Sequence, residues 1–220
     1  MDYSYLALIV VTLAIGLGAQ AYVNGKLSKY STVPNSLGIT GAQAAQRMLD
    51  YYGISGVPIK PGAHGEDFFD PRSNSITLSP EAFGTTSITS LATACHEVGH
   101  ACQYAFGYTP MKIRGAIVPV ANVASNAWIF ILLIGIFLNM AGLVWAAILM
   151  YAVVVLFQIA TLPVEFDASR RAMAYMQSIS LPQPEQKGAF DVLRACALTY
   201  LAAALTSILQ LLWLLGNNRD

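Results

Sequence analysis

The sequence predicts a mainly α-helical membrane protein in which four transmembrane helices carry a small α+β unit. Only 11% of the 220 residues are charged and 55% are hydrophobic, whereas roughly 25% of the residues in ordinary soluble domains are charged. The charged residues are also unevenly distributed, because long runs of the chain contain none. The net charge of zero does not suggest a nucleic-acid partner.

Four apolar segments are long enough to cross a bilayer, whose hydrocarbon core takes about 20 helical residues. Charged residues and histidine are absent from residues 4–25, 115–164 and 195–218. The middle run is long enough for two helices that turn near 139–142. We therefore expect membrane spans at about 4–23, 118–138, 143–162 and 195–215.

The first span has an alternative interpretation as a secretory signal peptide. Residues 19–21, Ala-Gln-Ala, resemble the small-residue site at which such peptides are cleaved. However, the leader carries no positive charge and the apolar stretch is long for a signal. We therefore expect residues 1–24 to form an uncleaved anchor.

The basic residues predict the orientation of the chain in a cell membrane. Of the 12 Lys and Arg residues, 11 lie in the segments 25–116 and 164–194, and Arg219 is the exception. Lys and Arg are enriched on the cytoplasmic side of membrane proteins. We therefore expect both segments in the cytoplasm, a transmembrane hairpin at 117–163, a last transmembrane helix within 195–220, and both termini outside.

Within 25–116 the periodicity of apolar residues predicts a small folded unit. A helix is expected at 41–52, a short strand at 57–59, a Gly- and Pro-rich loop at 62–72, and a strand at 75–78. The last strand is a candidate edge strand for pairing with an extended substrate. A further helix should begin after a cap at Thr85, Thr86 or Ser87 and run to about Tyr104.

After the stretch 162–167 we expect a helix that continues through Arg170, Arg171, Ala174 and Met176, and a break at Pro182 and Pro184. The chain has three cysteines, Cys95, Cys102 and Cys196. An odd number does not suggest a disulfide framework, so we interpret them as small buried residues in a reducing compartment.

The helix expected to end near Tyr104 contains the pattern His96-Glu97-Val98-Gly99-His100. Residues four apart lie one turn apart on the same helix face, so both imidazoles can bind one metal ion. In H-E-x-x-H helices the metal is zinc, and the glutamate is the general base for an attacking water. The alternative is a helix with two packed or solvated histidines.

A catalytic zinc usually has three protein ligands, so a third is expected elsewhere. Glu165 is the stronger candidate, because it follows the third span and two spans return the chain to the same membrane side. His64 is a second candidate. Glu165 could also be an interfacial carboxylate at the start of a helix.

Residues 94–103 resemble the catalytic helix of the YugP-like neutral zinc metallopeptidases, which are membrane-associated bacterial proteins. Matching segments continue in order over about 37–200, at 67–71 with 78–79, 107–111, 118–122 and 162–172. The resemblance implies a gluzincin-type site in which His96, His100 and Glu165 bind one Zn²⁺ and Glu97 is the base. This arrangement is similar to that of the HtpX-type and CAAX-prenyl membrane proteases.

The chain departs from the family at Phe68, where the family has a histidine, so this position has no ligand role here. The neighbouring Asp67 and Asp70 would either orient a zinc-bound histidine or shape a turn. Asp167 and Arg170 are further candidates for holding the ligands or an oxyanion. Other candidates with weaker grounds are Tyr104 and Tyr108, which would donate to an oxyanion or pack.

These observations predict a zincin-like cytoplasmic unit that hydrolyses peptide bonds in peptides or membrane proteins, with the lipid bilayer as its surroundings. Two other classes stay open. A non-enzymatic membrane adaptor with a structural zinc would tolerate Glu97→Gln, and a transporter component would need ionisable residues inside the spans, which are absent from 115–164 and 195–218. The sequence identifies no regulatory membrane partner.

Overall fold

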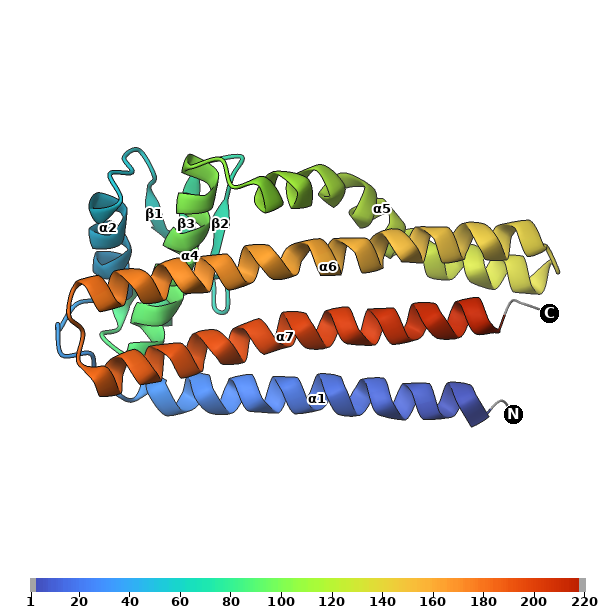
Figure 1. Cartoon of the computed structure of the whole chain (residues 1–220), viewed down its shortest axis with the longest axis horizontal. Helices are drawn as coiled ribbons and strands as arrows, with labels where there is room; N and C mark the ends of the chain where they lie inside the picture. Colours follow the sequence, from blue (N-terminus) through green and yellow to red (C-terminus); the bar gives the residue numbers. More distant parts are fainter. Residues whose placement is uncertain (1–2, 218–220) are drawn as a thin grey trace. The chain divides into compact units, whose positions relative to one another are not determined.

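The computed structural model describes residues 3–217, whose helices and strands are drawn in Figure 1. They divide into two compact units. One, the mixed unit, comprises residues 20–108 and 164–198. The other, the apolar unit, comprises residues 3–19, 109–163 and 199–217. The described residues do not include 1–2 and 218–220. The outermost residues of the predicted segments 1–24 and 195–220, Arg219 among them, therefore lie outside the described residues. The five-segment division of the chain stays a prediction.

The mixed unit is built around a small sheet with helices packed beside it. Its complete helices are α2 (Gly41–Tyr51), α3 (Pro80–Gly84) and α4 (Ile88–Ala105). Thr40 and Gln43 form a capping box at the start of α2, as the predicted helix over 41–52 requires. The short α3 was not predicted, although Ser79 caps it and Pro80 occupies its first turn.

The sheet contains β1 (Ile59–Pro61), β2 (Phe68–Asp70) and β3 (Ser75–Leu78) in the order β1-β3-β2. β1 runs parallel and β2 antiparallel to β3. The prediction of an edge strand at 75–78 is therefore wrong, because β3 has a partner on each side. The strand expected at 57–59 lies two residues later. The loop expected at 62–72 contains β2, whose Phe69 is buried despite the polar residues around it.

α4 is the central helix of the mixed unit and confirms the prediction for 85–104. Ser87 caps it by accepting a hydrogen bond from the backbone N–H of Ser90. It ends at Ala105, before Gly107, whose φ of 67° is a left-handed conformation that glycine adopts readily. Most residues of α4 are buried, so polar side chains on it must be satisfied within the protein.

The apolar unit contains α5 (Thr109–Phe137) and parts of α1 (Tyr3–Ser31), α6 (Ala141–Ser178) and α7 (Gln183–Gly216). Val144, Ile148, Tyr151 and Leu214 belong to its core. These four helices are long and apolar enough to cross a membrane, which confirms four candidate spans. The chain turns at 138–140, as expected.

α6 and α7 extend well beyond their predicted spans. α6 continues to Ser178, which confirms the helix expected through Arg170 and Met176. α7 begins at Gln183, so Pro184 lies in its first turn rather than breaking the chain. A proline fits there because the first N–H groups of a helix have no intrahelical acceptor.

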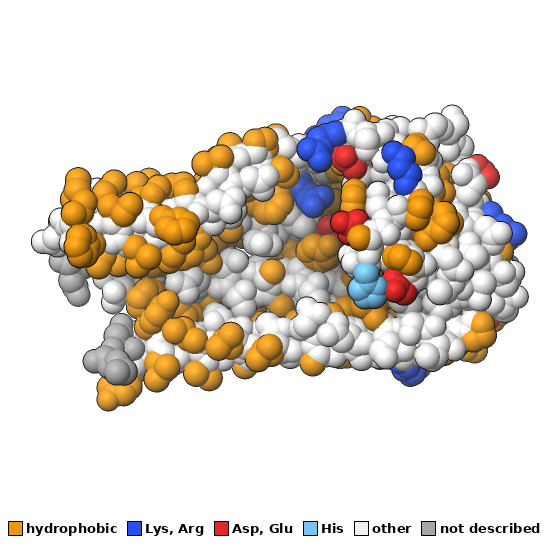
Figure 2. Space-filling model, turned by 180° about the vertical axis from the view of Figure 1, so that it is seen from behind, with side chains coloured by type: hydrophobic (Ala, Val, Ile, Leu, Met, Phe, Trp, Pro, Cys, Tyr) orange, Lys and Arg blue, Asp and Glu red, His pale blue; other side chains and the backbone are white. Residues whose placement is uncertain are grey.

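On the face shown in Figure 2, charged side chains gather in one region, whereas another region shows hydrophobic side chains without charged ones.

Candidate metal centre

His96 and His100 lie one turn apart on α4, and their ring centroids are 4.7 Å apart. The side chains are only 14% and 10% exposed. Two imidazoles this close and this buried need a hydrogen-bond acceptor or a metal ion for their nitrogens. The spacing of the H-E-x-x-H pattern therefore places both rings as the sequence predicted.

Glu165 on α6 completes the group. Its Oε2 lies 3.2 Å from His96 Nε2 and 3.6 Å from His100 Nε2. Two ligands at 2.0–2.1 Å from a tetrahedral zinc are about 3.4 Å apart, and the two distances lie on either side of that value. Two imidazole nitrogens and one carboxylate oxygen are also a common donor set for zinc. Within residues 3–217, these three side chains form the one group of at least three candidate ligands whose atoms lie close enough together to hold a metal ion.

Gly99 allows α6 to approach α4 this closely. A Cβ atom at Gly99 would lie 2.5 Å from the carbonyl oxygen of Ala168 and 2.9 Å from its Cα. Any side chain at this position would therefore push the two helices apart. Since Glu165 precedes Ala168 by less than one turn, the glycine permits the contact of Glu165 with the two histidines.

The outward-facing nitrogens of both histidines have partners. His96 Nδ1 lies 3.2 Å from the hydroxyl of Ser169, and His100 Nδ1 lies 3.0 Å from Gln103 Oε1. Metal-binding histidines usually donate this second N–H to an acceptor, which leaves the other nitrogen for the metal. The residues present therefore fit a zinc ion held by His96, His100 and Glu165.

Glu97 is buried next to these three residues. Burial raises the pKa of its carboxyl group, the charges of His100 and His96 lower it, and Glu165 and Asp67 raise it, with a net increase. For Glu165, burial opposes ionisation, but hydrogen bonds and charges from His100 and His96 outweigh it and lower the pKa. The surroundings therefore shift the pKa values of the two carboxyl groups in opposite directions.

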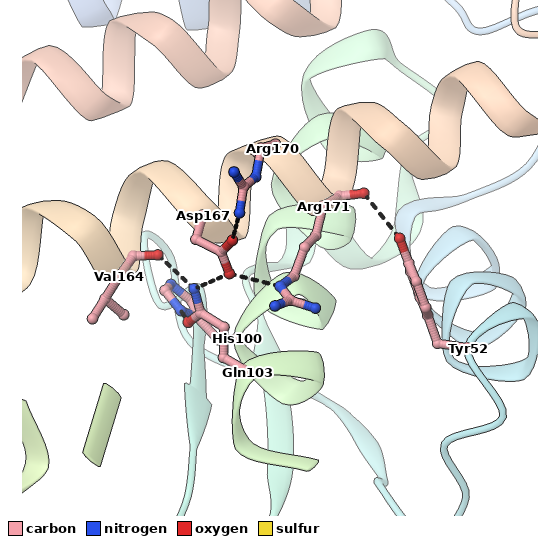
Figure 3. A network of polar contacts seen from close by, with 7 residues as sticks. All are labelled: Tyr52, His100, Gln103, Val164, Asp167, Arg170 and Arg171. Atoms are coloured by element: carbon pink, nitrogen blue, oxygen red, sulfur yellow. Dashed lines mark hydrogen bonds and ion pairs between the residues drawn. The ribbon is translucent and has the colours of Figure 1, made fainter. Parts of the chain in front are cut away.

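Asp167 lies on α6 two residues after Glu165 and is 4% exposed. It accepts hydrogen bonds from Gln103 at 3.1 Å, from Arg171 Nε at 2.6 Å, and from Arg170 (Figure 3). Burial raises the pKa of Asp167, but these three partners outweigh it and lower the pKa. Asp167 therefore reaches His100 through Gln103, and Arg170 is linked to the centre through Asp167.

The other candidates lie elsewhere in the mixed unit. His64 is highly exposed and pairs with Glu81 at 2.8 Å; it is not part of the candidate ligand group. The Asp70 carboxylate accepts hydrogen bonds within its own turn, from Arg72 and Ser73, as the turn alternative expects. Asp67 holds the backbone and hydroxyl of Ser79.

The two tyrosines considered as oxyanion donors, Tyr104 and Tyr108, both pack against neighbouring side chains. The ring of Tyr104 lies 5.7 Å from that of Phe69, and the guanidinium of Arg171 lies 5.8 Å from the ring of Tyr108. Phe68 is 43% exposed. Burial raises the pKa of the Cys95 thiol to about 12 and that of Cys102 to about 11, which agrees with buried, unreactive thiols.

Gln103 and Gly99 were not recognised from the sequence as functional residues. Gln103 follows His100 by three residues and therefore shares its helix face, which was the available signal. Gly99 is the only residue of the H-E-x-x-H turn without a side chain. A glycine inside a helix costs about 1 kcal/mol relative to alanine, so it often marks a close backbone approach.

Comparison with known proteins agrees with these motifs. Residues 5–218 match a family described as "Putative neutral zinc metallopeptidase". A curated relative from Bacillus subtilis (strain 168) is named "Putative membrane protease YugP". It is 38% identical to this chain over 222 aligned positions, and the aligned region covers 98% of each of the two chains. No solved structure matches the chain. The chain therefore belongs to the YugP-like family of neutral zinc metallopeptidases, as its motifs predicted.

Proposed function

We propose that this protein is a membrane-anchored, zinc-dependent endopeptidase that cleaves peptides or membrane proteins. The observation that carries the proposal is the convergence of His96, His100 and Glu165 beside the buried Glu97. The family description and the relative named as a membrane protease support it. Four helices long and apolar enough to cross a membrane support the anchoring.

His96 and His100 would bind the zinc ion through Nε2, and Glu165 through its carboxylate. When bound, zinc supplies a Lewis acid that polarises a carbonyl group and lowers the pKa of water towards about 7. Glu165 contributes the negative charge of the ligand set. Ser169 and Gln103 hold the imidazole rings at the nitrogens that face away from the ion.

Glu97 is the general base in this proposal. Its carboxylate accepts a proton from the attacking water and then donates it to the amine that leaves. Glu97 follows the ligand His96 directly and is buried beside the candidate ligands, where its carboxylate can reach a water molecule in the site. Its burial keeps bulk water away from the proton being transferred.

The active site would face the cytoplasm, with the bilayer as the surrounding partner. The distribution of 11 of the 12 basic residues in the segments 25–116 and 164–194 supports this orientation. The proposed substrates are accordingly peptides or membrane proteins whose cleaved segments are near the cytoplasmic membrane surface. A zincin-like organisation of the mixed unit is part of the same proposal.

The test is Glu97→Gln in detergent-purified protein, assayed with a quenched-fluorescent peptide library. We expect peptide cleavage to fall by about 10²- to 10⁴-fold, since the amide cannot accept the proton, while zinc content stays as in wild type. Glu66→Gln is the matched control, because Glu66 is exposed and caps a surface turn. Full activity of Glu97→Gln would reject the mechanism. Stoichiometric zinc without cleavage in wild type would favour the adaptor.

A further inference from the structure

We propose that Gln103 is a positioning residue of the metal centre. Its amide determines which nitrogen of His100 carries the proton, and it joins the helix of the two histidines to the helix of Glu165. The proposal rests on the zinc site of the proposed function and goes beyond its ligands. Gln103 is completely buried and lies on α4 three residues after His100.

The neighbours of Gln103 determine the orientation of its amide. Nε2 lies 2.7 Å from the carbonyl oxygen of Val164 and 3.1 Å from Oδ2 of Asp167 (Figure 3). A carbonyl oxygen and an ionised carboxylate can only accept hydrogen bonds. If the amide were turned over, its oxygen would face both acceptors without a proton between them. The nitrogen must therefore face α6.

This orientation leaves Oε1 of Gln103 facing His100 Nδ1 at 3.0 Å. An amide oxygen can only accept, so Nδ1 of His100 must donate and carries the proton. In a neutral imidazole the other nitrogen, Nε2, then has a free electron pair. It is this Nε2 that faces Glu165. Gln103 thus holds His100 in the tautomer that can bind a metal ion through Nε2.

The same amide also connects the two helices that carry the ligands. Val164 precedes Glu165 directly and Asp167 follows it by two residues, so both acceptors flank the third ligand. Asp167 is held in turn by Arg170 and Arg171. Tyr52 lies directly after α2, and its hydroxyl donates a hydrogen bond to the backbone oxygen of Arg171 at 3.5 Å. Displacement of Gln103 would therefore disturb His100 and Glu165 together.

The first experiment measures metal binding by Gln103→Met in the full-length, detergent-purified protein. Methionine has a similar length but removes the amide donor and acceptor. We expect the zinc Kd, obtained by competition with a chromophoric chelator, to rise by about 10- to 100-fold, as for other residues that support a metal ligand. The visible absorption bands of the Co²⁺-substituted protein should also change, because they report ligand geometry.

Gln186→Met is the matched control. Gln186 belongs to the same unit, and its amide donates to the backbone oxygen of Leu181 at 2.6 Å. This variant should keep the wild-type zinc Kd and Co²⁺ spectrum, whatever its stability. If Gln103→Met also keeps both, the role of Gln103 is refuted. If wild type binds no zinc, the proposed function itself is refuted, so the two failures are distinguishable.

A second pair of variants covers the case in which Gln103→Met does not fold. In Gln103→Glu the new carboxylate can still accept from His100, but its second oxygen faces the carbonyl oxygen of Val164 and the carboxylate of Asp167, so zinc binding should weaken. Adding Asp167→Asn supplies an amide donor to this carboxylate and removes the repulsion by Asp167, so it should restore part of the lost zinc affinity; the contact with Val164 is unchanged. A double variant that binds zinc no better than Gln103→Glu would refute the link between Gln103 and Asp167.

Discussion

The close contact between Gly99 and Ala168 makes Gly99→Ala the sharpest test of how the metal centre is assembled. The added Cβ would have to move by about 0.9 Å, from 2.5 Å to the 3.4 Å at which ordinary contact with the Ala168 oxygen begins. Metal–ligand distances tolerate only about 0.2 Å. A shift of α6 that relieves the contact therefore exceeds what the zinc ligands tolerate.

We expect Gly99→Ala to weaken zinc binding by about 10- to 100-fold. Overpacking of the helix contact should also destabilise the fold by roughly 1–3 kcal/mol, which corresponds to a fall of about 2–12 °C in the Tm of a chain of this size. Chelator competition and thermal unfolding followed by fluorescence measure the two effects. The loss should occur although alanine is the better helix former.

Gly84→Ala is the control for this prediction. Gly84 ends α3 in the same unit, and a Cβ atom there would meet nothing within 4 Å. Its zinc affinity should equal that of wild type. Wild-type zinc affinity in Gly99→Ala would show that the backbone approach at Ala168 does not position Glu165, and the reasoning would fail.

Two further predictions concern the proposed metal ligands and the residues that hold them. At a zinc concentration of about 100 times the Kd, zinc binding contributes about 2.7 kcal/mol to stability, so removal of zinc by a chelator should lower the Tm by about 5–11 °C. The Tm of Glu165→Ala should change little on chelation. A fall in Tm equal to that of wild type would place the third ligand elsewhere. Ser169→Ala removes the partner of His96 Nδ1 and should raise the zinc Kd by about tenfold. Ser178→Ala is the control and should keep the wild-type Kd, because the Ser178 hydroxyl donates to a backbone oxygen within α6. Equal Kd values for the two variants would exclude a supporting role of Ser169.

The four candidate membrane spans and the two close histidines on α4 were predictable because their signals are local. A charge-free run reports directly on its own burial in lipid, and the four candidate spans follow from it. The spacing of His96 and His100 reports on a single helix turn. Neither inference needs to know which distant segment lies beside the helix.

The sheet was less predictable because its pairing is not local. Phe68 and Phe69 lie in a stretch rich in Gly, Asp and Pro, which favours a loop. β2 forms there because β3 offers an unpaired side and Phe69 is buried. The edge position assigned to 75–78 was wrong for the same reason, since alternation of residues indicates a strand but not its neighbours.

The contact between α4 and α6 shows what a joint interpretation of two helix faces adds. On α4, His96, Gly99, His100 and Gln103 have the spacing i, i+3, i+4, i+7 that normally marks an apolar face. On α6, Glu165, Ala168, Ser169 and Ala172 have the same spacing. The α4 face carries two candidate metal ligands and the α6 face carries one, and each face has a small residue at the closest approach and a hydrogen-bond partner for the opposite helix. Because the two faces bury polar groups, each group requires its partner, and this requirement specifies the register of α6 on α4 more narrowly than apolar packing would.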